Sequence, residues 1–342
     1  PSRSGADALT YREAVLGCLY GGAVGDALGL EVEFSSLERV RERFGPEGIT
    51  EPELTEGISN VSDDTQMTMF TLDAVFSHLC ATHQDIVDLV RDAYLRWYKT
   101  QNRDVSWSAP DDPLVLEDEP SLNYLRAPGG TCCQALADGG HGTIENPINN
   151  SKGCGGVMRV APIGLVRQWT PEECFEVGAK AAAVTHTHPT GYLSSGAMAQ
   201  IVREIVDGVS PLEAANRSLF ALEKWADHGE TNDAIQGAIG LAESVTTPSA
   251  EHITSLGEGW IAEEALAIGL YSCLVSDTYE EAICLAANHS GDSDSTASIA
   301  GQIFGAWKGV DCISKKWIEQ LDVYDPLSRL VEDFLAEAQS EQ

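Results

Sequence analysis

Two short acidic segments contain the residues of this sequence that are best suited to chemistry. Ser62-Asp63-Asp64-Thr65 stands early in the chain, and Asp292-Ser293-Asp294-Ser295 stands near its end. Carboxylate and hydroxyl oxygens are hard ligands, which suit Mg2+, Mn2+ or Ca2+ better than Zn2+. Each segment also precedes an apolar helical pattern, and a hydroxyl followed by acids is an ordinary way to begin a helix. Taken singly, each segment is therefore better explained as a helix start than as a metal site.

Several well-known motifs do not fit these or other segments. An EF-hand beginning at Asp292 would need Gly at its sixth position and Glu at its twelfth, where the chain has Ala297 and Ile303. A nucleophile elbow would need Gly in place of Ser295. Gly257-x-Gly259 lacks the preceding strand of a dinucleotide-binding loop. The nine cysteines are scattered without a Cys-x-x-Cys pair, so we expect reduced thiols and no zinc or iron–sulfur centre.

The elements that must position the acidic segments are predicted to be helices. Apolar residues recur at helical spacing, and the alternating patterns typical of strands are nearly absent. Residues 45–60, 104–131 and 139–156 are rich in Gly or Pro and are predicted to be long loops, which in compact domains are usually functional. Helix starts with the sequence of a capping box occur at Thr10, Thr170, Ser210 and Thr278. The sequence therefore predicts an all-α protein.

Composition limits the domain organisation and the partners. We expect one domain at residues 11–335, between a disordered or tag-derived segment 1–10 and a tail 336–342. There is no apolar stretch of about 18 residues and no hydrophobic export segment, so we expect a cytoplasmic protein without membrane contact. The formal net charge of −32 argues against nucleic-acid binding. An acidic protein that binds phosphates would neutralise them with backbone N–H groups, a few basic side chains or a divalent cation.

Several motifs in a fixed order give the acidic segments a common interpretation. Together they resemble the ADP-ribosylglycohydrolase family, including its dinitrogenase-reductase-activating and ADP-ribosylarginine hydrolase branches. The resemblance covers roughly residues 11–310. Besides the two acidic segments, the matching motifs are Gly25-Asp26-Ala27-Leu28-Gly29, Val32-Glu33-Phe34, Arg126-Ala127-Pro128-Gly129, Gly155-Gly156-Val157-Met158-Arg159, Thr185-His186 and Gly259-Trp260.

The resemblance implies a single compact orthogonal helical bundle with long active-site loops and two Mg2+ ions, Mn2+ being the alternative. Asp63 and Asp294 would also be catalytic residues, and Glu33 would position or activate the attacking water. Two cations would relieve the repulsion among converging carboxylates. Asp26 would orient the first motif rather than bind metal. The implied metal ligands are Ser62, Asp63, Asp64, Asp292, Asp294 and Ser295.

A glycine-rich loop that holds a pyrophosphate is also implied by the resemblance. Its N–H groups would approach the phosphate oxygens, and a following helix would add its N-terminal dipole. The chain departs from the family pattern at Cys154, where relatives often carry Asn, and at Lys152, which could pair with a phosphate. The implied substrate-binding residues are Asn150, Ser151, Gly153, Gly155, Gly156, Val157, Met158, His186 and Trp260.

The implied activity is hydrolysis of the glycosidic bond between ADP-ribose and an acceptor, which is a modified protein or a small molecule. N-linked ADP-ribosylarginine is the favoured substrate, and O-linked ADP-ribosylserine and ADP-ribose 1''-phosphate are the alternatives. An alternative of another class is a non-catalytic ADP-ribose binder or a crystallin-like protein. The four converging carboxylates and Glu33 argue against it, because a structural protein gains nothing from them. A monomer is expected, although no motif decides the oligomeric state.

Overall fold

The computed structural model describes residues 9–80, 84–102, 116 and 119–340. The chain is all-α, as predicted, and the described residues contain three isolated bridges but no β-sheet. The first helices in chain order are α1 (Tyr11–Leu30), α2 (Leu37–Phe44), α3 (Asp63–Cys80), α4 (Ile86–Gln101), η1 (Pro120–Leu122), α5 (Gly130–Ala137), η2 (Val157–Arg159), α6 (Ala161–Gly164), α7 (Pro171–Ala183) and α8 (Pro189–Val206). They are followed by α9 (Pro211–Leu222), α10 (Gly229–Ser244), α11 (Ala250–Thr254), α12 (Ala262–Val275), α13 (Tyr279–Ala287), α14 (Ser293–Lys308), η3 (Val310–Cys312), α15 (Lys315–Glu319) and α16 (Tyr324–Ser340).

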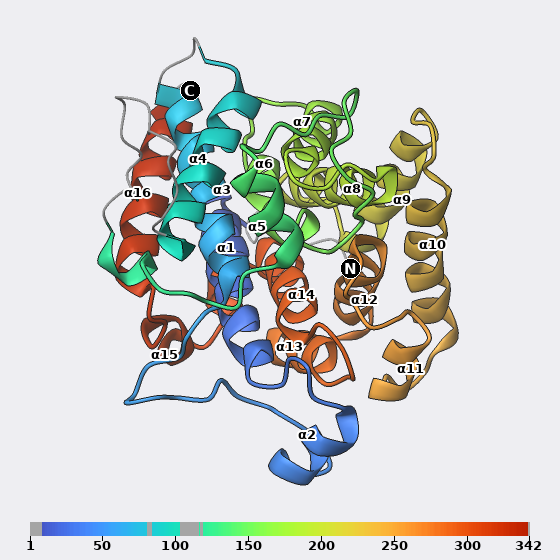
Figure 1. Ribbon diagram of the computed structural model, residues 1–342. Coiled ribbons are helices and arrows are strands. Elements are labelled where there is room, and N and C mark those ends of the chain that lie inside the picture. Colours follow the sequence, from blue (N-terminus) through green and yellow to red (C-terminus); the bar gives the residue numbers. More distant parts are fainter. Residues whose placement is uncertain (1–8, 81–83, 103–115, 117–118, 341–342) are drawn as a thin grey trace.

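Two helices from opposite ends of the chain, α1 and α14, lie side by side in the middle of the fold (Figure 1). They run antiparallel with their backbones in contact. A Cβ atom added to Gly21 would lie 2.3 Å from the carbonyl oxygen of Gly301, and one added to Gly29 would lie 2.2 Å from that of Ser293. Any side chain at these positions would force the helices apart. The contact therefore brings the end of α1 beside the start of α14, where the second acidic segment lies.

We expect Gly21→Leu to destabilise the protein by about 3 kcal/mol, because the added side chain would separate two backbones that touch. Gly237→Ala is the matched control: Gly237 lies in α10, where an added Cβ meets no atom within 4 Å. That substitution should stabilise the protein by up to about 1 kcal/mol, since Ala favours helix over Gly. Urea unfolding followed by circular dichroism measures both changes. A Gly21→Leu variant as stable as the parent would contradict this packing.

The other helices pack on both sides of this central pair. On one side α3 packs against α4 and α16, and on the other α14 packs against α8, α12 and α13 (Figure 1). The capping boxes predicted at Thr10, Thr170 and Thr278 are formed, with both reciprocal hydrogen bonds present in each. Ser210 caps α9 by accepting a hydrogen bond from the Glu213 N–H. Helix starts were thus predictable from local sequence, because their hydrogen bonds are local.

Two of the three predicted loops are described in full, and the third only in part. Residues 45–60 form an irregular connection between α2 and α3, and 139–156 connect α5 to η2 without helix. Much of the predicted loop 104–131 lies outside the described residues, but its last residues already belong to α5. Most of segment 1–10 also lies outside the described residues. The last helix, α16, runs from Tyr324 to Ser340 across the expected boundary at residue 335, and the expected domain limits stay a prediction.

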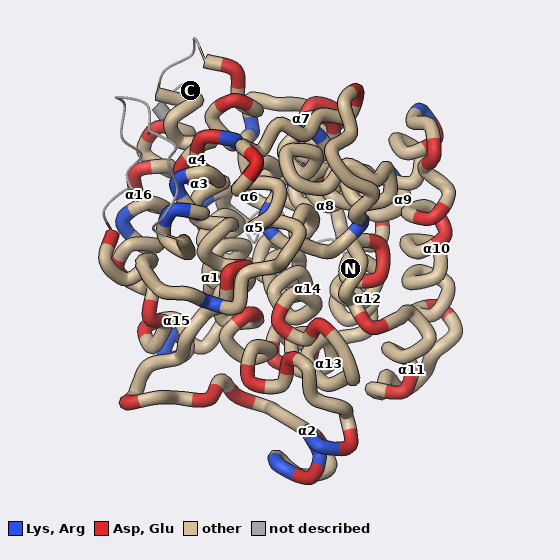
Figure 2. Tube along the Cα trace, in the orientation of Figure 1, with Lys and Arg blue, Asp and Glu red and all other residues tan. Residues whose placement is uncertain are grey.

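The described helices include none with the length and apolar character needed to span a bilayer. All nine cysteines are described, and none forms a disulfide. Figure 2 shows Asp and Glu distributed over the whole described chain, with Lys and Arg scattered between them. The expectation that the protein does not bind nucleic acid stays a prediction.

Candidate active site

The first acidic segment begins α3 and is oriented by Asp26, a buried residue of α1. One oxygen of Asp26, Oδ2, accepts hydrogen bonds from the Ser62 N–H at 3.0 Å and from the N–H and hydroxyl of Thr65 at 3.1 and 2.5 Å. Ser62 Oγ accepts a further bond from the Asp64 N–H at 3.1 Å. These bonds satisfy N–H groups that a helix start leaves without partners. They agree with the expectation that Asp26 orients this motif.

The second acidic segment begins α14 and contacts the first. Asp292 caps the helix by accepting a hydrogen bond from the Ser295 N–H at 3.4 Å. Ser295 Oγ donates to Asp64 Oδ2 at 2.7 Å, a buried bond between residues 231 positions apart. The Asp292 N–H donates to the carbonyl of Glu258 at 2.8 Å, which brings the loop before α12 to the same place. The two helix starts therefore meet through direct side-chain contact.

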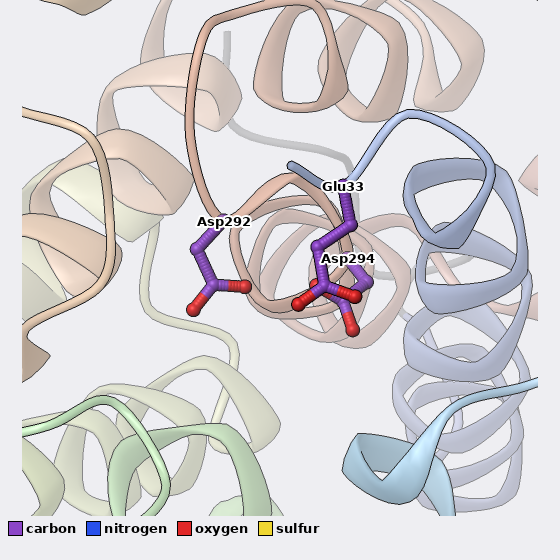
Figure 3. Close-up of side chains that lie close together, drawn as sticks. All are labelled: Glu33, Asp292 and Asp294. Atoms are coloured by element: carbon purple, nitrogen blue, oxygen red, sulfur yellow. The ribbon is translucent and has the colours of Figure 1, made fainter. Parts of the chain in front are cut away.

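Carboxylates from both helix starts and from the segment after α1 converge at this point. Asp63, Asp64 and Asp294 each have an oxygen within 4.8 Å of the others, and Glu33, Asp292 and Asp294 form a second such group. Figure 3 shows the carboxylates of Glu33, Asp292 and Asp294 close together, Glu33 approaching from the segment after α1. Asp294 belongs to both groups. All five residues line one cleft of about 340 Å³.

Burial and repulsion raise the pKa values of four carboxyl groups in this cleft, those of Glu33, Asp63, Asp64 and Asp292. The pKa values of Asp63, Asp64 and Asp292 are raised well above the usual range, first because burial penalises the charged form and second because Asp294 lies nearby. The same two causes raise the pKa of Glu33 to about 9. Without a compensating positive charge, Glu33 therefore holds a proton at neutral pH, and the charged forms of the three aspartates are disfavoured.

This set of side chains fits divalent cations of the hard class. Oxygen atoms supply every predicted ligand, and the carboxylates are crowded enough to need compensating positive charge. Asp294 Oδ1 is buried and, within the described residues, has no hydrogen-bond partner. A buried carboxylate oxygen without a partner is costly unless an ion or water meets it. Of the six predicted ligands, Ser62 alone does not line the cleft, and its Oγ is engaged by the Asp64 N–H.

Asp26 gives a testable dependence of stability on pH. Burial, followed by the charge of Asp294, raises its pKa to about 7, whereas an ordinary aspartate titrates near 3.8. The folded state then holds the Asp26 proton more tightly than the unfolded state. The contribution of this proton to the stability of the fold is therefore full below pH 3.8 and is lost as pH rises through 7. In EDTA, we expect the melting temperature to fall between pH 5 and pH 8, and to fall less in Asp26→Asn. Thermal melts measure this, and an equal fall in both proteins would contradict it.

The glycine-rich loop contributes part of the cleft wall. Gly153, Gly155 and Met158 line the cleft, whereas Asn150, Ser151, Gly156 and Val157 do not. A helix does follow the glycines, but it is the three-residue 3-10 helix η2, too short to supply the expected N-terminal dipole. Three residues complete less than one α-helical turn, and α6 after it has only four residues.

Lys152 ties this loop to α10 and α12. Its Nζ donates to Glu230 Oε2 and to Glu263 Oε1, both at 2.6 Å. The Lys152 carbonyl accepts from the Ala262 N–H at 2.8 Å, and the Cys154 N–H donates to the Trp260 carbonyl at 3.0 Å. Lys152 is therefore engaged by carboxylates, and its effect is to fix the loop that lines the cleft.

His186 lines the cleft as a buried, neutral imidazole. Burial, followed by the charge of Arg159, lowers its pKa to about 3. Thr185 Oγ1 lies 2.7 Å from His186 Nδ1 and accepts a hydrogen bond of the same length from Arg159 Nη2. The Arg159 guanidinium lies 4.1 Å from the ring centre of Tyr94. His186 can therefore accept or donate a hydrogen bond in the cleft without adding charge.

Two aromatic rings stand at the mouth of the cleft. Phe34 stacks on Trp260 with ring centres 5.2 Å apart and planes 19° apart, and both line the cleft. Phe34 is 73% exposed and has a φ of 63°, which is rare for a bulky residue. The Trp260 indole N–H donates to Glu258 Oε2 at 3.1 Å. Two aromatic rings, one of them bonded to the Glu258 carboxylate, therefore lie at this opening.

Several residues of the cleft were not predicted from the sequence. The Gly129 N–H donates to Asp63 Oδ2 at 3.3 Å, and the motif Arg126-Ala127-Pro128-Gly129 was the signal that could have placed this segment at the site. Phe34 belongs to one of the matching motifs and Cys154 to the glycine-rich loop, but a single sequence does not show that their side chains line the cleft. The cleft residues not predicted are Phe34, Ala127, Pro128, Gly129, Gly130, Thr131, Cys132 and Cys154.

This chain is similar to known proteins of one kind, in sequence and in fold. Residues 7–342 match the family model of the ADP-ribosylglycohydrolases. The ADP-ribosyl-[dinitrogen reductase] glycohydrolase of Rhodospirillum rubrum is 25% identical, over 92% of each chain. The ADP-ribosylarginine hydrolase Tri1 of Serratia proteamaculans is 24% identical, over 95% of this chain and 80% of the relative. A solved structure titled ADP-ribosylglycohydrolase-related protein complex has the same fold, with a TM-score of 0.62 at 23% identity over 96% of this chain and 99% of that one.

Proposed function

The chain belongs to the ADP-ribosylglycohydrolase family and is therefore a hydrolase of glycosidic ADP-ribose bonds, and from this premise we propose its finer activity. It depends on two divalent cations, Mg2+ with Mn2+ as the alternative, and its substrate is N-linked ADP-ribosylarginine. The ions bind to the six predicted ligands at the starts of α3 and α14. ADP-ribose lies along the cleft, with its pyrophosphate at the glycine-rich loop.

One observation carries this proposal: Asp294 is shared by the two carboxylate groups. Asp63 and Asp64 complete one group, and Asp292 and Glu33 complete the other. A shared carboxylate with an unpaired buried oxygen supports two ions close together rather than one. The second candidate class, a binder without activity, gains no support from such a group, because unneutralised buried carboxylates only destabilise a fold.

The residues of the cleft provide the chemical groups that hydrolysis of a glycosidic bond needs. When bound, the two ions would provide positive charge that orients sugar hydroxyls and water and offsets the carboxylates. Glu33 takes the proton of the water that attacks the anomeric carbon. Its nearness to Asp292 and Asp294 supports this role, and the positive charge of bound ions would favour its carboxylate form. The bond between that carbon and the acceptor nitrogen breaks, and the acceptor leaves with a proton. His186 stays neutral and can bind the nucleotide by a hydrogen bond.

The mouth of the cleft supports arginine as the acceptor. A guanidinium is planar and positively charged, and it stacks on aromatic rings. Phe34 and Trp260 offer such rings, with Glu33 and Glu258 beside them. A serine acceptor and a phosphate have no planar cation that could stack on these rings. The Glu33 and Glu258 carboxylates would also repel the phosphate. The name of the Serratia relative supports the same substrate.

A panel of substrates tests the proposed activity. Peptides carrying arginine-linked or serine-linked ADP-ribose, and ADP-ribose 1''-phosphate, are incubated with the protein in Mg2+, Mn2+ or EDTA. We expect release of ADP-ribose from the arginine-linked peptide with Mg2+ or Mn2+, and none in EDTA. Faster release from the serine-linked peptide would overturn the acceptor assignment. Undiminished turnover in EDTA would overturn the metal requirement.

Gly155 gives a prediction for the glycine-rich loop. A side chain there would meet Cys132 Sγ and His186 Cε1, each 2.8 Å from the added Cβ, so a larger residue would displace the loop into the cleft. We expect Gly155→Val to weaken ADP-ribose binding about a hundredfold, since loss of several phosphate contacts costs about 3 kcal/mol. Mg2+ affinity should change little. Calorimetric titration with each ligand measures this, and unchanged ADP-ribose affinity would remove the loop from the binding site.

A further inference from the structure

A chain of hydrogen bonds runs from a buried arginine to the histidine of the cleft. Arg159 Nη2 donates to Thr185 Oγ1 at 2.7 Å, and this hydroxyl lies 2.7 Å from His186 Nδ1. All three side chains are at most 1% exposed. Bulk water is therefore nearly excluded from these bonds, and the protons must be shared among the protein groups themselves.

The guanidinium decides the direction in which the Thr185 hydroxyl donates. An arginine side chain carries only donors, so Thr185 Oγ1 must accept from Arg159, and its own proton is directed elsewhere. Two acceptors are in reach, His186 Nδ1 at 2.7 Å and the Ala182 carbonyl at 3.4 Å. That carbonyl already accepts the N–H groups of Thr185 and His186, at 3.1 and 2.9 Å. The hydroxyl therefore donates to Nδ1, because the opposite arrangement would leave it only a third and longer bond to the carbonyl.

The bond to Nδ1 fixes where the imidazole proton lies. A neutral imidazole has one N–H, so when Nδ1 accepts a hydrogen bond the proton is on Nε2. His186 lines the cleft, and in the described part of the chain its Nε2 has no hydrogen-bond partner. This nitrogen lies at the glycine-rich loop, since a Cβ added to Gly153 or Gly155 would be 3.4 or 3.1 Å from it. An N–H donor therefore lies where the pyrophosphate is proposed to bind.

We propose that Thr185, held by Arg159, is a positioning residue that keeps the His186 proton on Nε2, so that the imidazole donates a hydrogen bond to a phosphate oxygen of ADP-ribose. A charged phosphate oxygen only accepts hydrogen bonds. The other tautomer would present a lone pair to it and weaken binding. The identity of the ligand rests on the proposed function, whereas the position of the proton follows from the hydrogen bonds alone.

Nitrogen-15 NMR of the full chain, labelled at histidine and kept in Mg2+, tests the position of the proton. Two-bond couplings to the carbon-bound ring protons distinguish a protonated ring nitrogen from an unprotonated one. His186→Gln identifies the signals of this residue among those of the eight histidines. We expect the Nε2–H form in the parent protein without nucleotide. Thr185→Val has nearly the same shape but no hydroxyl, and it should lose this preference and bind ADP-ribose about tenfold more weakly by calorimetry.

Two further variants control for changes in packing. Thr185→Ser keeps the hydroxyl, and it should restore both the Nε2–H form and the ADP-ribose affinity that Thr185→Val loses. Thr231→Val makes the same change at a buried threonine of α10, whose hydroxyl lies 3.0 Å from Ser194 Oγ. It should leave the His186 signals as they are in the parent.

Two results would overturn the inference. One is a parent protein in which the His186 proton lies on Nδ1, a result that needs no variant. The other is a Thr185→Val variant, helical by circular dichroism, that keeps either the Nε2–H form or the parental ADP-ribose affinity. Failure of the proposed function is seen separately, as no release of ADP-ribose from any of the modified substrates, and it would leave the NMR result unchanged.

Discussion

Replacement of Asp294 by Asn is expected to reduce turnover of ADP-ribosylarginine by at least about a hundredfold, since losing even one preorganised stabilising group costs about 10²–10³ in kcat. Asp294 belongs to both carboxylate groups, and it is buried at the start of α14. Asparagine keeps the shape of the side chain but removes the charge. We therefore expect Mg2+ affinity to fall together with kcat, measured by calorimetry and by release of ADP-ribose.

The stability of this variant separates a functional effect from misfolding. Without cations, Asp294 raises the pKa values of Asp63, Asp64 and Asp292 by repulsion, so removing its charge relieves the fold. In EDTA, Asp294→Asn should melt at or above the parent temperature. Asp311→Asn is the control, an exposed aspartate just after α14 that should change neither property. Full Mg2+-dependent activity of Asp294→Asn would contradict the proposed centre.

Glu33→Gln is expected to lower kcat about 10²–10⁴-fold, the usual contribution of a positioned acid or base. Glu33 lines the cleft and lies within 4.8 Å of Asp292 and Asp294, where an attacking water would stand beside the metal centre. Glutamine occupies the same volume but takes no proton. ADP-ribose affinity should change little, because the nucleotide is proposed to bind at the glycine-rich loop.

Comparison of kcat with binding decides the role of Glu33. Glu31→Gln is the matched control, because Glu31 pairs with Arg43 at 3.1 Å and does not line the cleft. It should retain parental turnover. An equal loss of ADP-ribose affinity and of kcat in Glu33→Gln would show a binding residue instead.

Much of the helical fold was predictable, because the signals are local. A capping box such as Thr10-x-x-Glu13 contains both partners of its hydrogen bonds within one helical turn. The apolar helical pattern after the second acidic segment predicted a helix there, and the structure has one from Ser293 to Lys308. Local signals could not show that the two acidic helix starts meet. That expectation came from the resemblance, and the direct bond between Ser295 and Asp64 agrees with it.

The features that escaped prediction depend on contacts between distant segments. Glycines recur every fourth residue from Gly17 to Gly29, a pattern that favours close helix packing, but the sequence does not name the partner helix. The stacking of Phe34 on Trp260 and the contact of Cys154 with Asp292 also join distant segments. Lys152 shows a contact of another kind. Its charge suggested that it could pair with a phosphate, but in the structure Glu230 and Glu263 engage it. A single sequence shows which charges exist, and the fold decides which of them meet.

Anomalous diffraction from a crystal grown with Mn2+ tests the central claim most directly. We predict two anomalous peaks in the cleft, both within bonding reach of Asp294, one beside Asp63 and Asp64 and the other beside Asp292. A map without a peak near Asp294, from a protein that still releases ADP-ribose with Mn2+, would contradict the proposed two-ion centre.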